Sequence, residues 1–199
     1  MIVTVASFKG GVAKSTTAVH LASWLNQHGP TVLVDGDPNR SVSGWAKRGK
    51  LPFRVIDDRQ AAKVIRDESP THLVIDTPAR PSRDDVQELA DGCDLLIVPT
   101  TPDVLSLDSL MATVDTLRAV GAERFRVLLA IVPPRPSRDG DEARAMLVDA
   151  GLPVFAAQIR RAVAFQRAAL AGCLVSEVKD ARAAEAWADY QAVGAELLP

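Results

Sequence analysis

The sequence predicts a single α/β domain over residues 1–199, with a doubly wound, mostly parallel sheet flanked by helices. Short runs rich in Val, Ile and Leu alternate with segments of helical period, a pattern typical of strands buried on both faces of a parallel sheet. The composition, 47% hydrophobic and 24% charged, is that of a globular protein with room for one sizeable core. The predicted strands are 2–6, 31–34, 73–75, 95–98 and 127–132, with a weaker candidate at 154–155.

The bulk properties exclude several classes. A net charge of −2 means that any anionic partner must be bound by a local basic patch. Cys93 and Cys173 lie outside any Cys-x-x-Cys spacing, so we expect neither a metal knuckle nor a disulfide framework. We find no signal-peptide pattern and no apolar stretch near the ~20 residues of a membrane-spanning helix. We therefore expect a cytoplasmic protein without membrane association.

A glycine-rich loop separates the first predicted strand from the first predicted helix, 15–28. Its sequence is Ser7-Phe8-Lys9-Gly10-Gly11-Val12-Ala13-Lys14-Ser15-Thr16. Strand, glycine loop and helix in this order build a phosphate site, because loop amides face the anion, Lys14 supplies a cation and the Ser15 hydroxyl can bind Mg²⁺. The template Gly-x-x-x-x-Gly-Lys-Ser/Thr is missed at both glycines, by Phe8 and Ala13. The alternative is a chance Gly-Gly loop with two solvated lysines.

Carboxylates follow the next two predicted strands. Asp35 and Asp37 are two residues apart, so they point to the same side, at the edge where an open α/β sheet binds ligands. The alternative for Asp37 is that it caps the helix that follows Pro38. Asp76 ends the strand after that, and a hard cation such as Mg²⁺ prefers oxygen ligands. We expect Asp76 to face Ser15 across a magnesium site.

These three motifs, in this order, resemble the ParA/MinD family of P-loop ATPases, and most closely its small ParA-type partition members. Lys9-Gly10-Gly11-x-x-Lys14-Ser15 resembles the deviant Walker A loop of that family. There the extra lysine, here Lys9, reaches across an ATP-bound sandwich dimer to the partner's phosphates. The resemblance implies an ATP site made by Lys9, Gly10, Gly11, Val12, Ala13, Lys14, Ser15 and Thr16.

The resemblance also implies roles for the other motifs. Ser15, Asp35 and Asp76 would hold Mg²⁺ and its water shell, and Asp37 would position the attacking water beside Lys9 and Lys14. The family usually has glycine where this chain has Ala13. If that position needs a positive φ, alanine costs about 1 kcal/mol or more there. We therefore expect ATP binding to survive and turnover to be slow unless a partner stimulates it.

Two later segments have less specific patterns. In related proteins the adenine ring lies near the loops after the late strands, which makes Pro134 and Arg135 candidate base contacts; the alternative is an ordinary rigid connection. Residues 38–56 contain five basic and no acidic residues, typical of a solvated face or of a subsidiary phosphate-binding or dimer-flanking patch. These are Arg40, Lys47, Arg48, Lys50 and Arg54.

The C-terminal region is also basic. Between residues 158 and 182, five bases stand against Glu177 and Asp180. The layout resembles the family's non-specific DNA-binding face, where phosphate contacts need charge and depend on salt. The alternative is solvated helix ends. The candidate DNA-binding residues are Arg160, Arg161, Arg167, Lys179 and Arg182.

The expected function is that of an ATP-dependent homodimer that binds DNA over the nucleoid and hydrolyses ATP to ADP and phosphate. It would position a plasmid, a chromosome or another cargo, with hydrolysis stimulated by a ParB-like or cargo adaptor protein. A MinD-like regulator needs a basic amphipathic tail, which 194–199 lacks, and a nitrogenase-reductase-like electron carrier needs interface cysteines. A metabolic P-loop ligase of the dethiobiotin-synthetase type stays open.

Overall fold

The computed structural model describes residues 1–79 and 82–198. Within these residues, one six-stranded sheet forms the centre of the molecule, with strand order β3-β2-β4-β1-β5-β6 and parallel pairing throughout. The predicted doubly wound α/β fold is confirmed. The strands are β1 (Ile2–Ser7), β2 (Thr31–Asp35), β3 (Arg54–Asp57), β4 (His72–Ala79), β5 (Leu95–Thr100) and β6 (Phe125–Leu129).

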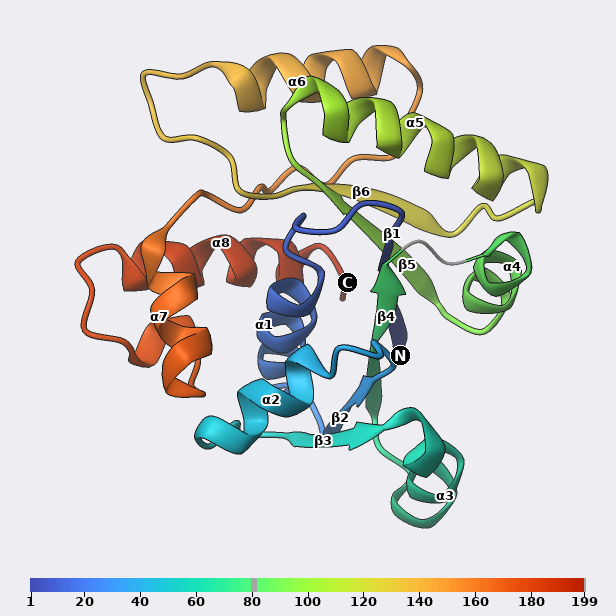
Figure 1. Ribbon diagram of the computed structural model, residues 1–199, viewed down its shortest axis with the longest axis vertical. Coiled ribbons are helices and arrows are strands. Elements are labelled where there is room, and N and C mark those ends of the chain that lie inside the picture. The colour runs from blue at the N-terminus through green and yellow to red at the C-terminus, as the bar shows by residue number, and fades with distance from the viewer. Residues whose placement is uncertain (80–81, 199) are drawn as a thin grey trace.

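Helices cover both faces of the sheet (Figure 1). Neighbouring strand residues such as Val32 and Leu33 belong to different buried clusters, which explains why the strands are apolar throughout. No helix among the described residues is long and apolar enough to span a membrane. On one face lie α1 (Lys14–Asn26), α2 (Ser41–Arg48), α7 (Val163–Ala171), the 3₁₀ turn η1 (Val175–Glu177) and α8 (Ala183–Ala195); on the other lie α3 (Asp58–Glu68), α4 (Arg83–Asp91), α5 (Val104–Ala119) and α6 (Asp139–Asp149).

The sheet differs from the prediction at its two ends. β3 was not predicted, because this edge strand lies in the basic segment and buries Ile56 but little else. The last strand was predicted over 127–132 but ends at Leu129, because Ile131 adopts a left-handed φ of 54° that an extended strand cannot continue through. The weak candidate at 154–155 is only a single bridge between Val154 and Val127.

The strand order brings the predicted motifs to one edge. β1 and β4 are neighbours, and the helices that follow them, α1 and α4, lie on opposite faces of the sheet, so the carboxyl ends of these strands open at a topological switch point. Asp35 and Asp76 are direct partners in the β2–β4 register. The glycine loop, which follows Ser7 at the end of β1, therefore begins beside both acidic strand ends.

Candidate functional site

The glycine loop forms a phosphate-sized cradle at the start of α1. Gly11 and Ala13 both have left-handed backbones, with φ of 78° and 68°, so the loop turns sharply before Lys14 opens the helix. The first helical amides have no partner within α1 and face the loop. The Lys14 side chain lies in the cradle and is only 7% exposed. The cradle opens into a cleft of about 630 Å³ that Asp37 also lines.

Ala13 has a positive φ, the conformation in which alanine is expected to be strained. Its φ of 68° and ψ of 27° lie in the region where glycine is favoured and a Cβ atom is unfavourable. Because the residue precedes Lys14 directly, its conformation sets the direction in which the helix N-terminus points. Alanine therefore keeps the loop geometry at a cost in folding free energy.

Ser15, Asp35 and Asp76 offer the donor set that a magnesium ion requires. The Ser15 hydroxyl donates to Asp76 Oδ2 at 2.6 Å, and Asp35 Oδ2 accepts the Ser43 amide at 2.7 Å. The second oxygens, Asp35 Oδ1 and Asp76 Oδ1, are buried, and neither has a hydrogen-bond partner in the described part of the chain. Burial raises the pKa of Asp76 to about 7, and the Ser15 hydrogen bond and the Lys14 charge only partly offset that effect.

These orphaned oxygens fit Mg²⁺, which takes few protein oxygens and keeps several waters. Between residues 1–79 and 82–198, no three His, Cys, Asp or Glu side chains group closely enough to hold a metal unaided. The arrangement thus suits an ion that arrives with a phosphate ligand and water. It does not suit a resident structural metal.

Asp37 lies on a tight loop at the end of β2 and is 6% exposed. Its Oδ1 accepts the Asn39 amide at 2.8 Å. The alternative that Asp37 caps the next helix is wrong, because α2 begins at Ser41 and the carboxylate that binds its N-terminal amides belongs to Asp35. One oxygen of Asp37 is therefore left to face the cleft.

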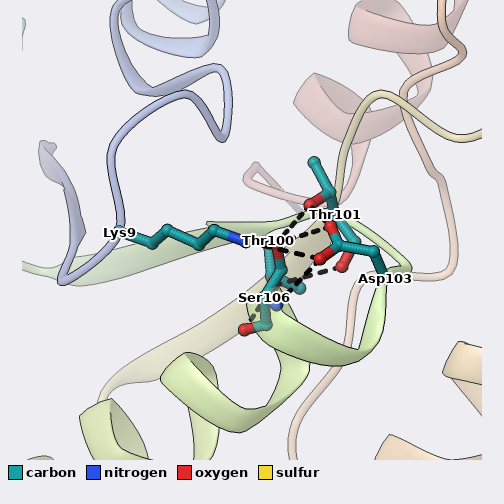
Figure 2. Close-up of polar contacts among 5 residues, drawn as sticks. All are labelled: Lys9, Thr100, Thr101, Asp103 and Ser106. Atoms are coloured by element: carbon teal, nitrogen blue, oxygen red, sulfur yellow. Dashed lines mark hydrogen bonds and ion pairs between the residues drawn. The ribbon is translucent and has the colours of Figure 1, made fainter.

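Lys9 is held away from the cradle by its own chain (Figure 2). Its Nζ donates to Ser106 Oγ at 2.6 Å and to Asp103 Oδ1 at 3.3 Å, at the start of α5. Asp103 caps that helix through the Ser106 amide at 3.0 Å, and it also accepts the hydroxyls of Ser106 and Thr101. The hydrogen bonds from Ser106 and Thr101 hold the pKa of Asp103 well below its usual range. The sequence analysis did not identify this contact between Asp103 and Lys9.

A second hollow of about 340 Å³ adjoins the other side of the loop. Gly11, Ala13 and Thr16 form its loop wall, and Phe165 and Tyr190 add an aromatic wall. Pro134 and Arg135 line neither this hollow nor the cleft; they lie in a separate depression with Gln158 and Arg182. Their role as base contacts stays a prediction.

The five predicted DNA-binding residues divide into those that form ion pairs and those that do not. Arg160 is paired with Asp189 and Glu185, and Arg167 with Asp180. Arg161, Lys179 and Arg182 are exposed, and in the described ranges none of the three forms an ion pair. Arg161 and Arg182 line one hollow of about 680 Å³ beside α7. The free charge of this region thus comes from three of the five residues.

The earlier basic run is mostly engaged in structure. Arg40 and Arg54 pair with Asp58 and Glu68, and Arg48 Nε donates to the Ala169 carbonyl at 2.8 Å. Lys47 and Lys50 are exposed. Trp45 is buried in the core and donates its ring N–H to the Cys173 carbonyl at 3.0 Å.

A buried histidine, whose role the sequence did not indicate, supports the cradle from below. His20 Nδ1 lies 2.7 Å from the Thr16 carbonyl, and Nε2 accepts the Val175 amide at 3.1 Å, which places the proton on Nδ1. The ring stacks on Tyr190 with a centroid distance of 4.9 Å. Burial lowers the pKa of His20 to about 4, so the ring is neutral at physiological pH. The first turn of α1 is thereby tied to η1 and α8.

Comparisons with known proteins identify the family of the chain. Residues 3–175 match the CobQ/CobB/MinD/ParA nucleotide binding domain. The chain is 37% identical over 201 residues to a Maintenance of carboxysome distribution protein A of Gloeobacter kilaueensis, covering 98% of this chain and 93% of the relative.

Solved structures share the fold. The ATP complex of McdA from Cyanothece superposes with a TM-score of 0.74 at 18% identity, over 98% of this chain and 95% of that one. A plasmid partition protein of Borrelia burgdorferi B31 bound to AMPPNP gives a TM-score of 0.73 at 16% identity, over 99% of each chain. With the cradle, the paired acidic strand ends and the match over residues 3–175, the chain belongs to the ParA/MinD-type family of P-loop nucleotide-binding proteins.

Proposed function

We propose that this protein is an ATP-dependent, dimerising ATPase that binds DNA without sequence specificity and positions a cargo. The proposal is carried by three features together: Lys9 of the glycine loop is bound away from the cradle, Lys14 is buried in the cradle, and two carboxylate oxygens at one sheet edge are orphaned. A simple phosphate-binding loop requires only Lys14. Lys9 is not used by the cradle of its own chain, and we propose that it acts on the nucleotide of a second subunit.

In the proposed reaction, the loop amides and Lys14 bind the phosphates of ATP, and a bound magnesium ion would neutralise part of the phosphate charge. Ser15, Asp76 and Asp35 would hold that ion and its waters. Asp37 orients a water for attack on the γ-phosphate with the carboxylate oxygen that does not bind Asn39. Lys14 and Lys9 stabilise the charge that develops on the transferred group.

Lys9 would complete the site only in the dimer. In this conformation its Nζ is bound to Ser106 and Asp103 of its own chain. Two ATP molecules held between two subunits would attract both Lys9 side chains across the interface, because a phosphate carries more negative charge than one carboxylate. Dimerisation then depends on ATP, and hydrolysis reverses it.

The proposal extends to partners through the relatives. The Gloeobacter kilaueensis relative is a carboxysome distribution protein and the Borrelia burgdorferi neighbour is a plasmid partition protein, so this chain is proposed to distribute a cargo along the nucleoid. An adaptor bound to the cargo would stimulate hydrolysis. Arg161, Lys179 and Arg182 supply the unpaired charge for DNA phosphates. The hollow lined by Phe165 and Tyr190 would receive the adenine.

The test measures mass by light scattering with Mg²⁺ and ATP, ADP or no nucleotide, together with retention on non-specific duplex DNA. We expect dimers and DNA retention with ATP alone, and only monomers for Lys9→Ala. Lys63→Ala, which removes an exposed lysine on α3 at the other face of the sheet, is the matched control and should behave as wild type. Dimerisation of Lys9→Ala with ATP would remove the cross-subunit role.

A second variant separates binding from chemistry. Asp37→Ala should keep the ATP-bound dimer and stop phosphate release, because it removes the water-orienting carboxylate and leaves the cradle intact. Undiminished hydrolysis by Asp37→Ala would exclude Asp37 from that role. Formation of a ligation product without ATP-dependent DNA retention would favour the ligase alternative.

A further inference from the structure

Arg40 has a strained backbone for a residue that is not glycine. It adopts φ 51° and ψ 41° at the N-terminus of α2, three residues after Asp37. A left-handed conformation costs about 1–2 kcal/mol for an L-residue and persists only where the surroundings fix it. Strain of this kind gathers at functional sites, so the contacts that hold Arg40 indicate what the strain serves.

The Arg40 side chain spans the ends of two strands. One guanidinium nitrogen donates to the backbone carbonyl of Asp35, and the other donates to Asp58 Oδ1 at 3.0 Å. Asp58 is the first residue of α3, directly after β3. The planar guanidinium can reach both acceptors at once, which a lysine cannot do with the same geometry. We call this pair of contacts the Arg40–Asp58 bridge.

The bridge encloses the loop that carries Asp37. The Arg40 amide donates to the Asp37 carbonyl at 2.8 Å, so the strained residue is bonded directly to Asp37 through its backbone. At the other end of the loop, the Gly36 amide donates to the Asp76 carbonyl at 2.9 Å. The segment between is therefore fixed at β4 on one side and at Arg40 on the other.

The exposure of the bridge argues against a role in stability alone. The side chains of Arg40 and Asp58 are 39% and 58% exposed, and exposed ion pairs contribute little to folding. A contribution that small would not by itself account for a left-handed arginine. A glycine at position 40 would remove the strain, yet it would also release the loop.

We propose that Arg40 and Asp58 are positioning residues for Asp37, holding its carboxylate in the orientation that activates water in ATP hydrolysis. The inference rests on the proposed function, since it explains how the Asp37 carboxylate of that same site is oriented. Arg40 also lines the cleft, but the assignment gives neither residue a contact with the phosphates. Their effect passes through the loop of residues 36–40.

The test compares Arg40→Gly, Asp58→Asn and the double variant with wild type for ATP hydrolysis, ATP affinity and melting temperature. Arg40→Gly suits the left-handed backbone, so the fold is retained. We expect kcat to fall by about tenfold while the Kd for ATP stays within about twofold, because misplacing a catalytic group affects the transition state more than binding. The double variant should lose no more than Arg40→Gly alone, because both act through one bridge.

The matched control is Arg54→Ala. Arg54 and Glu68 form the same kind of exposed ion pair between β3 and α3, at the opposite end of those elements. It should leave kcat unchanged. Equal kcat values for Arg40→Gly and Arg54→Ala would overturn the proposal, as would a parallel fall in ATP affinity and melting temperature, which would mark a structural role.

A readout without turnover separates this proposal from the proposed function. In nucleotide-free protein, hydrogen exchange at the Asn39 amide, which Asp37 protects, should accelerate in Arg40→Gly and in Asp58→Asn but not in Arg54→Ala. If wild type hydrolyses no ATP, the proposed function fails. Hydrogen exchange at the Asn39 amide would still show whether the Arg40–Asp58 bridge fixes the orientation of Asp37. Unchanged exchange in both bridge variants would overturn the positioning role.

Discussion

Lys9 Nζ lies 3.3 Å from Asp103 Oδ1 of the same chain, although 94 residues separate the two positions in the sequence. The contact joins the glycine loop to the N-terminus of α5 (Figure 2). The side chains of Lys9 and Asp103 are 33% and 55% exposed, so the ion pair is weak and readily broken. In the proposed sandwich dimer, Lys9 would first have to leave this contact with Asp103.

Asp103→Asn should therefore favour the ATP-bound dimer. Asparagine still caps a helix, so α5 stays intact while the charge that attracts Lys9 is removed. Each of the two subunits gives up one exposed pair worth at most about 1 kcal/mol, so the dimer gains at most about 2 kcal/mol, or about a thirtyfold lower dimer dissociation constant in the presence of ATP. Sedimentation across a concentration series measures it. Asp108→Asn, an exposed change one turn later on α5, should have no effect, and an equal shift in that control would contradict the prediction.

Ala13→Gly should stabilise the nucleotide-free protein. Relief of the left-handed strain gains about 1–2 kcal/mol, and the extra freedom of glycine in the unfolded chain offsets about half of that gain. Urea unfolding should show an increase of about 0.5–1 kcal/mol. Ala112→Gly, at an exposed position inside α5, should instead destabilise by about 1 kcal/mol. A loss of stability in Ala13→Gly would show that the loop prefers alanine.

His20 should make stability depend on pH. The folded protein keeps His20 neutral until about pH 4, whereas in the unfolded chain its pKa is near 6.5. Since the unfolded state binds the extra proton between these values, the contribution of His20 is full above pH 6.5 and is lost as the pH falls toward 4. The loss amounts to something on the order of 3 kcal/mol.

His20→Gln isolates this effect. Between about pH 7.5 and about pH 5, wild type should lose more unfolding free energy than His20→Gln, because only wild type carries the buried titrating ring. His28→Gln, which changes an exposed histidine at the end of α1, should follow wild type. Parallel pH profiles for wild type and His20→Gln would refute the prediction.

DNA retention should depend on the unpaired bases. The double variant Arg161→Ala/Arg182→Ala should weaken binding more at about 50 mM than at about 200 mM salt, and the slope of log K against log salt should fall by about one for each DNA phosphate that the variant no longer neutralises. Arg118→Ala, on α5 and the opposite face of the sheet, is the control. Titrations with a fluorescent duplex measure the slopes. Binding of equal strength at both salt concentrations would exclude a phosphate-binding face.

The sequence predicted the fold and the cradle because both depend on local order along the chain. Apolar strands of fixed length and a loop between strand and helix are visible residue by residue, and Asp35 and Asp76 meet as soon as β2 and β4 pair. Ala13 could be identified as a strain site because the template has glycine there. These features require no knowledge of distant contacts.

What the sequence could not show are pairings between distant segments. The contact between Lys9 and Asp103 depends on where α5 begins relative to β1. The Arg40–Asp58 bridge depends on β3, an edge strand whose pattern is too polar to be predicted. The pairing of Arg160 with Asp189 likewise removes a charge that the sequence counted as free. In each case an apparently solvated charge has a partner more than ten residues away.

The contact between α8 and α1 has a consequence for how the molecule opens. The hydroxyls of Thr17 and Tyr190 are 3.1 Å apart and buried, and a Cβ on Gly194 would lie 2.2 Å from the Trp24 ring, so the two helices meet without space between them. Segments packed this closely open as one cooperative unit. A ligand that binds the loop before α1 should therefore also slow the opening of α8. Hydrogen exchange at the amides of α8 would then report whether the nucleotide site is occupied.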